Sequence, residues 1–62
     1  MKYEEVINAI NEGKNVFWSN DNYEIIKDEL YNKERYLIHS KSNDYYIGFN
    51  NDEYYLKKCY IK

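Results

Sequence analysis

The feature that most constrains the fold is a change of hydrophobic period at Gly13. In residues 2–12 the apolar side chains recur at the i, i+3, i+4 and i+7 spacing of an amphipathic helix, at Tyr3, Val6, Ile7 and Ile10. Glu4 and Glu5 fall in the first turn, where negative charge favours the helix dipole. Gly13 supplies a left-handed stop, and the cation of Lys14 follows it. The sequence therefore predicts one N-terminal helix.

Beyond Gly13 the chain consists of short aromatic and β-branched runs separated by Asn, Asp and Ser clusters, which is typical of strands joined by tight turns. We predict strands at residues 16–19, 23–31, 35–41, 45–49 and 54–61, with turns at 20–22, 32–34, 42–44 and 50–53. The chain has no proline that would argue against these strands. The predicted class is α+β, with the N-terminal helix packed on an antiparallel β-meander of four or five strands.

The length of 62 residues fits one domain, residues 1–62, with a thin core. A core of this size supplies roughly 3–5 kcal/mol, and the single cysteine, Cys59, allows no disulfide within the chain. We therefore expect a homodimer, which adds buried surface. An unpaired thiol suits a reducing compartment, and we expect a cytoplasmic protein with no membrane contact, since no run approaches the roughly 18 apolar residues of a membrane span.

The sequence offers little for catalysis. The only histidine, His39, and Cys59 fall on different predicted strands with no third orienting group. Two such side chains are too few for structural zinc, and two glycines are too few for a phosphate-binding loop. Adjacent carboxylates such as Asp28 and Glu29 point apart in regular structure and are expected on the solvated surface. We predict a non-enzymatic protein with no catalytic, cofactor or metal site; an enzyme that uses His39 and Cys59 is the weakest alternative.

Tyrosine is unusually abundant, with nine copies, and aromatic residues make up 19% of the chain. Aliphatic side chains on the predicted strands can meet the helix on one face of the sheet, which leaves the second face to tyrosines. Exposed aromatic side chains of this kind suit a protein partner or self-association. The predicted partner-binding residues are Trp18, Tyr36, Tyr45, Tyr46, Tyr54 and Tyr55.

Nucleic-acid binding is the alternative that the aromatic residues leave open. The pairs Tyr45-Tyr46 and Tyr54-Tyr55, on strands predicted to be adjacent, could form a stacking platform for single-stranded nucleic acid. Nine basic against eleven acidic residues give a net charge of −2, so the chain has no surplus of positive charge for a phosphate backbone. The carboxylates are also interleaved with lysines, which disfavours a mimic of DNA.

The segment Tyr3-Glu4-Glu5-Val6-Ile7-Asn8-Ala9-Ile10-Asn11-Glu12-Gly13-Lys14-Asn15-Val16 resembles the start of short phage and prophage proteins from AT-rich bacteria. In those proteins a helix ends at Gly-Lys and feeds directly into a strand. The resemblance covers about a quarter of the chain. That group includes inhibitors of CRISPR nucleases and of other bacterial defence systems. The resemblance thus implies a small protein that binds a bacterial host protein and inhibits or redirects it.

Overall fold

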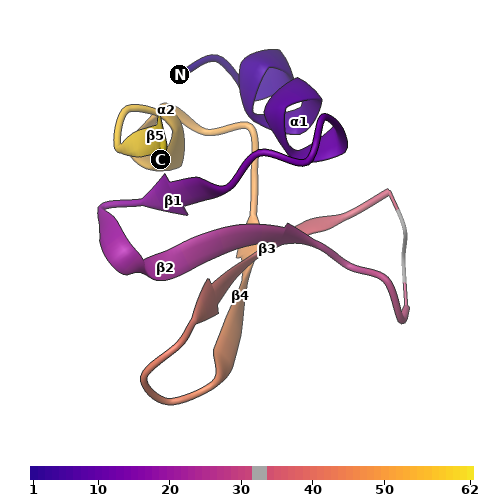
Figure 1. The fold of residues 1–62 in the computed structure, drawn as a ribbon, viewed down its shortest axis with the longest axis vertical. Coiled ribbons are helices and arrows are strands. Elements are labelled where there is room, and N and C mark those ends of the chain that lie inside the picture. The colour runs from indigo at the N-terminus through magenta and orange to yellow at the C-terminus, as the bar shows by residue number, and fades with distance from the viewer. Residues whose placement is uncertain (32–33) are drawn as a thin grey trace.

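The computed structural model describes residues 1–31 and 34–62, and it places an N-terminal helix on an antiparallel five-stranded sheet (Figure 1). The elements in chain order are α1 (Tyr3–Asn11), β1 (Val16–Trp18), β2 (Asn20–Lys27), β3 (Tyr36–Ser40), β4 (Tyr45–Phe49), α2 (Glu53–Leu56) and β5 (Cys59–Ile61). The strand order is β4-β3-β2-β1-β5. Strands β1 to β4 form a meander, and β5 returns to pair with β1. The predicted α+β class is confirmed.

Helix α1 begins and ends within one residue of its predicted bounds. At its start the backbone N–H of Lys2 donates a 2.7 Å hydrogen bond to the carboxylate of Glu5, which satisfies a donor that the helix itself leaves free. At its end Gly13 has a φ of +84°, the left-handed conformation that glycine adopts without a Cβ clash. The face that α1 turns to the sheet buries Val6 and Ala9.

The core lies between α1 and one face of the sheet, which we call the helix side. Cross-strand pairing aligns Ile38 with Ile25 and Ile25 with Val16 under the helix. At the start of α1 the ring of Tyr3 stacks on Phe49 with centroids 5.7 Å apart. The buried cluster consists of Val6, Ala9, Val16, Ile25, Tyr36, Ile38, Phe49, Leu56 and Cys59.

Strand β4 has the predicted bounds, and β1 and β3 lie inside theirs, but the predicted turn at residues 20–22 is wrong. The chain reverses at Ser19, whose φ is +68°, so that Trp18 already pairs with Asn20. The side chain of Asn22 accepts a 2.9 Å hydrogen bond from the N–H of Ser42, and that of Asn20 accepts one of 2.9 Å from the N–H of Asn22. Asn32 and Lys33 of the predicted turn at 32–34 lie outside the described residues.

The predicted strand at residues 54–61 is also wrong in its first half. Residues Glu53–Leu56 form the short helix α2, and a side-chain oxygen of Asp52 caps it by accepting a 2.9 Å hydrogen bond from the N–H of Tyr54. This helix carries the chain from β4, at one edge of the sheet, towards β1. It also buries Leu56 in the core.

Asp28 closes the end of the β2–β3 hairpin and is buried, with 4% of its surface exposed. One of its oxygens accepts hydrogen bonds from the backbone N–H groups of Leu30 and Tyr31, at 3.2 and 3.0 Å. The other accepts from Nε and Nη2 of Arg35, at 3.1 and 2.7 Å. The expectation of a solvated surface position is wrong for Asp28, because β2 ends at Lys27 and the carboxylate turns inward to bind the loop.

The core assignment predicts unequal effects for isoleucines at the middle and at the end of one cross-strand row. Ile38→Ala should lower the free energy of unfolding by about 2–5 kcal/mol, because Ile38 is 0% exposed and its removal leaves a cavity. Ile61→Ala, in the same row but 45% exposed, is the control and should cost much less. Urea denaturation measures both, and equal losses would contradict this core.

The environment of Asp28 predicts an acid-sensitive contribution to stability. The hydrogen bond from the Tyr31 N–H and those from Arg35 hold the pKa of the Asp28 carboxyl below its usual value of 3.8. Its stabilisation is therefore fully present above that value and is lost as the pH falls through the lower pKa of the folded state. We expect Asp28→Asn to lower Tm at neutral pH and to flatten the decrease of Tm between about pH 5 and 2.

Thermal unfolding followed by circular dichroism at several pH values tests this expectation. Hydrogen bonds from Lys62 and Tyr60 also lower the pKa of Asp21, and this group remains in both proteins. A Tm difference between wild type and Asp28→Asn that stays constant down to the acid end would mean that another carboxylate carries the effect.

Candidate protein-interaction surface

An aromatic cluster covers the part of the helix side that α1 leaves open. Its centre is Trp18 of β1, whose ring centroid lies 5.6 Å from Tyr23 of β2. Two tyrosines of α2 pack on the same ring, Tyr55 at 5.8 Å and Tyr54 at 6.2 Å. We call Trp18, Tyr23, Tyr54 and Tyr55 the Trp18 cluster. It joins residues that are far apart in the sequence because α2 folds back beside β1.

The Trp18 cluster is anchored in the core and open to solvent at its outer rim. Tyr55 touches the core ring of Phe49 at 6.3 Å between centroids, whereas Tyr54 is 56% exposed. The Nζ atom of Lys58 lies 6.0 Å from the Trp18 ring, at the outer limit of a cation–π contact. Aromatic side chains held in this way bury a large area on binding at a low cost in side-chain entropy.

The indole Nε1 of Trp18 is buried and has no hydrogen-bond partner among the described residues. A buried donor without an acceptor costs roughly 1–3 kcal/mol. The centre of the cluster therefore retains a polar group with unused hydrogen-bonding capacity, in addition to its apolar area.

Exposed apolar side chains continue from this cluster along the helix side to the edge of the sheet. Tyr23 pairs with Ser40, and Ser40 pairs with Tyr45, so the two tyrosines flank a small side chain in one cross-strand row. Tyr45 is 68% exposed, and Ile47, two residues further along β4 on the same side, is 46% exposed. Together with the Trp18 cluster they form an apolar and aromatic strip across the sheet.

Four of the six predicted partner-binding residues lie on this side of the sheet: Trp18, Tyr45, Tyr54 and Tyr55. Tyr46 lies on the opposite face, as the alternation along β4 predicts. The prediction of Tyr36 as a partner-binding residue is wrong, because Tyr36 is 6% exposed and belongs to the buried cluster. Tyr23 was missed, although its alternation with buried Ile25 along β2 places it on the helix side.

The prediction that tyrosines cover the second face of the sheet was only partly right. Of the nine, Tyr46 and Tyr60 lie on this outer face, where Tyr46 stacks on His39 with ring centroids 4.5 Å apart. Phe17, also on this face, is only 7% exposed, because the ring of Tyr60 lies 5.8 Å away and Nζ of Lys41 lies 4.9 Å above it.

Ion pairs engage two lysines beside the aromatic rings of the outer face, Lys41 and Lys62. Nζ of Lys41 lies 3.5 Å from the carboxylate of Glu24, and Nζ of Lys62 donates to Asp21. The Tyr60 hydroxyl also donates to Asp21, and this hydrogen bond raises the pKa of Tyr60 to about 12. The face therefore offers aromatic rings with little uncompensated positive charge. The predicted stacking platform is also absent, because Tyr54 and Tyr55 lie in α2 and not on a strand beside β4.

A groove of about 510 Å³ crosses the outer face beside the β2–β3 loop. Its floor is apolar and includes Ile26, Leu37 and Gly48. Leu30 and Tyr31, which also line it, are 85% and 88% exposed. This groove adds a second apolar area, on the face away from the Trp18 cluster.

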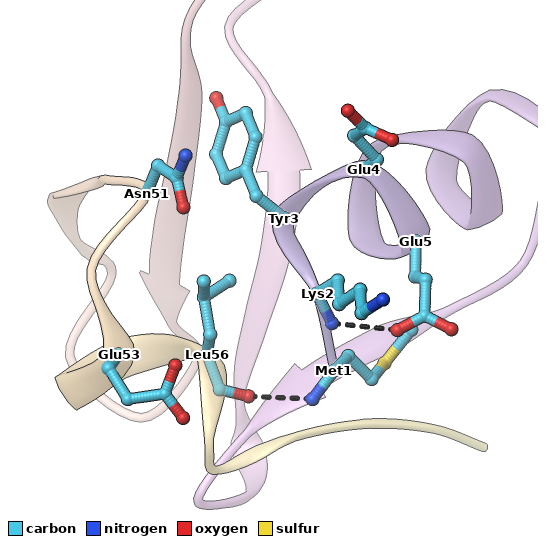
Figure 2. A pocket seen from close by; sticks show the side chains of 8 residues that line it. All are labelled: Met1, Lys2, Tyr3, Glu4, Glu5, Asn51, Glu53 and Leu56. Atoms are coloured by element: carbon cyan, nitrogen blue, oxygen red, sulfur yellow. Dashed lines mark hydrogen bonds between the residues drawn. The ribbon is translucent and has the colours of Figure 1, made fainter.

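A larger and more polar hollow of about 710 Å³ lies between the start of α1 and α2 (Figure 2). Glu4 and Glu5 line it from α1 and Glu53 from α2. The N-terminal ammonium of Met1 donates a 2.9 Å hydrogen bond to the carbonyl of Leu56, which ties the chain start to α2. The carboxylates are exposed and do not converge on one point, so the hollow has no arrangement suited to acid–base chemistry.

His39 and Cys59 lie on opposite faces of the sheet and cannot share a proton. Nε2 of His39 lies 2.7 Å from the carboxylate of Asp44 on the outer face. Cys59 lies on the helix side, where its thiol donates to the carbonyl of Tyr55 at 3.4 Å and burial raises its pKa. A higher pKa disfavours the nucleophilic thiolate. Within residues 1–31 and 34–62, no three His, Cys, Asp or Glu side chains gather closely enough to hold a metal ion.

Neither helix of the described chain has the length and apolar character needed to cross a membrane. Comparisons with models of protein families, with curated proteins and with solved structures give no match for this chain.

Proposed function

We propose that this chain is a small non-enzymatic phage-type protein that binds a bacterial host protein in the cytoplasm and inhibits or redirects it, with a defence system as the expected target. The phage-type origin rests on the resemblance of residues 3–16. The binding role rests on one structural observation, the anchored and partly exposed Trp18 cluster.

The Trp18 cluster supports a protein partner because it combines fixed aromatic rings with an apolar strip of partly exposed side chains. Tyrosine and tryptophan are the residues most enriched among those that dominate binding energy in protein interfaces. The Tyr54 side chain reaches solvent, while its ring packs against the rings of Trp18 and Tyr55. Its side chain therefore loses little conformational entropy on binding. A host protein with a shallow apolar pocket would suit this surface.

Nucleic acid is the less favoured partner because the cations near the aromatic rings of the outer face are paired. Lys41 and Lys62 form ion pairs with Glu24 and Asp21. A phosphate backbone would have to displace those carboxylates before it gained any contact.

Tyr54→Ala tests the proposed surface. Affinity chromatography from bacterial lysate and mass spectrometry identify the captured protein, and titration with that purified protein measures Kd. We expect Tyr54→Ala to raise Kd by at least about tenfold, because it removes an aromatic contact at the interface. Addition of the wild-type chain should also inhibit or alter the activity of the captured protein.

Tyr31→Ala is the matched control, since Tyr31 is 88% exposed but lies in the β2–β3 loop away from the Trp18 cluster. It should leave Kd unchanged. Equal losses for the two variants would reject this surface. Binding of single-stranded DNA or RNA that weakens steeply with salt would instead favour the nucleic-acid alternative.

A further inference from the structure

We propose that β4 pairs with β4 of a second copy of this chain, antiparallel and about a two-fold axis at Ile47, so that the two sheets become one. This pairing assigns a surface to the homodimer. It does not depend on the proposed host partner, since the purified chain alone is sufficient to test it.

The first argument is the direction of the backbone groups of β4. Along β3, the residues that bond to β2 alternate with those that bond to β4. Just outside β3, the N–H of Lys41 donates to the carbonyl of Asn22, and the carbonyl of Arg35 accepts from the N–H of Asp28. The backbone N–H and C=O groups of the odd-numbered residues of β3 therefore point towards β2. Its even-numbered residues bond to their β4 partners, such as Ile47 opposite Ile38. The N–H and C=O groups of Tyr46 and Gly48 therefore point outward, on a side that no described strand covers.

The second argument is that β4 lacks the usual protection of an edge strand. Natural edges carry lysine, proline, inward-pointing charges or bulges that prevent pairing with another chain. Residues 45–49 contain none of these side chains, and no register shift interrupts their pairing with β3. The other edge, β5, is only three residues long and lies between Lys58 and Lys62.

The third argument is self-complementarity. A two-fold axis at Ile47 keeps all of β4 paired and places Tyr46 opposite Gly48 of the second copy. Tyr46 and that Gly48 then exchange both backbone hydrogen bonds, and the two Ile47 side chains meet at the centre on the helix side. At the ends Asp44 faces Asn50 of the second copy, so no like charges oppose each other.

Gly48 provides the fourth argument, because nothing in the described fold of one chain requires a glycine there. A Cβ at this position would meet no atom within 4 Å, and its φ is not in the left-handed range. Glycine inside a strand is destabilising relative to alanine and often marks the close approach of another backbone. In the paired sheet the ring of Tyr46 of the second copy lies over Gly48. It continues the row formed by Ile26 and Leu37 and fills the outer-face groove.

Ile47→Lys tests the pairing, with Ile61→Lys as the matched control. The two isoleucines are 46% and 45% exposed and lie at opposite ends of one cross-strand row. Sedimentation equilibrium should give wild type and Ile61→Lys twice the mass of the 7.7 kDa chain. In Ile47→Lys two ammonium groups would oppose each other, and its dimer dissociation constant should rise by at least about tenfold. Circular dichroism checks that each variant stays folded.

Ile47→Cys gives an independent readout of the register. Directly opposed residues at a non-hydrogen-bonded position have Cα atoms about 4.5 Å apart, within the range of a disulfide. Mild oxidation should therefore link Ile47→Cys into a covalent dimer and leave Ile61→Cys unlinked. Three results would each overturn the proposal. The first is a wild type that is monomeric at about 100 μM, which means a dimer dissociation constant above this level. The others are a dimer lost only in Ile61→Lys and the absence of a cross-link in Ile47→Cys.

Discussion

The limited reach of one nine-residue helix over a five-stranded sheet is the constraint from which the rest of the structure follows. Helix α1 covers the middle of the helix side, where Val16, Ile25 and Ile38 are buried. It leaves the area around Trp18 to α2 and the sheet edge at β4 to solvent. Tyrosine and tryptophan tolerate partial burial, because their rings pack on the protein while their polar end remains exposed to solvent. This partly covered area holds four of the nine tyrosines: Tyr23, Tyr45, Tyr54 and Tyr55.

Local periodicity predicted those elements that one stretch of sequence specifies by itself. The i, i+3, i+4, i+7 pattern and Gly13 gave α1, and the alternation of residues 45–49 gave β4 with the correct sorting of Tyr45 and Tyr46. The reversal at Ser19 could not be predicted in this way, because a serine at φ +68° is held there by contacts elsewhere, including the 3.0 Å hydrogen bond from its N–H to the Lys58 carbonyl. Helix α2 was missed although Asp52 is a good N-cap, since four residues are too few to show a helical period.

The candidate site shows the same division between local and long-range information. Residue type singled out Trp18, Tyr54 and Tyr55 as candidates. Their meeting in the structure depends on α2 folding back beside β1, which no local pattern encodes. Tyr36 was misjudged because aromatic character alone does not say which face of a strand α1 will cover. Its partner in the register, Phe49, lies under Tyr3, so Tyr36 belongs to the core.

The proposed host-binding surface and the proposed self-pairing edge can coexist, because Trp18 and Tyr54 lie away from β4. Tyr45 is where the two surfaces meet: in the paired sheet it stands opposite Phe49 of the second copy and loses part of its 68% exposure. A dimer would then present two Trp18 clusters on the same face of one sheet, since a two-fold axis normal to the sheet keeps both helix sides together. Two sites linked in this way favour a target that is itself symmetric, because the second contact forms at a high effective concentration.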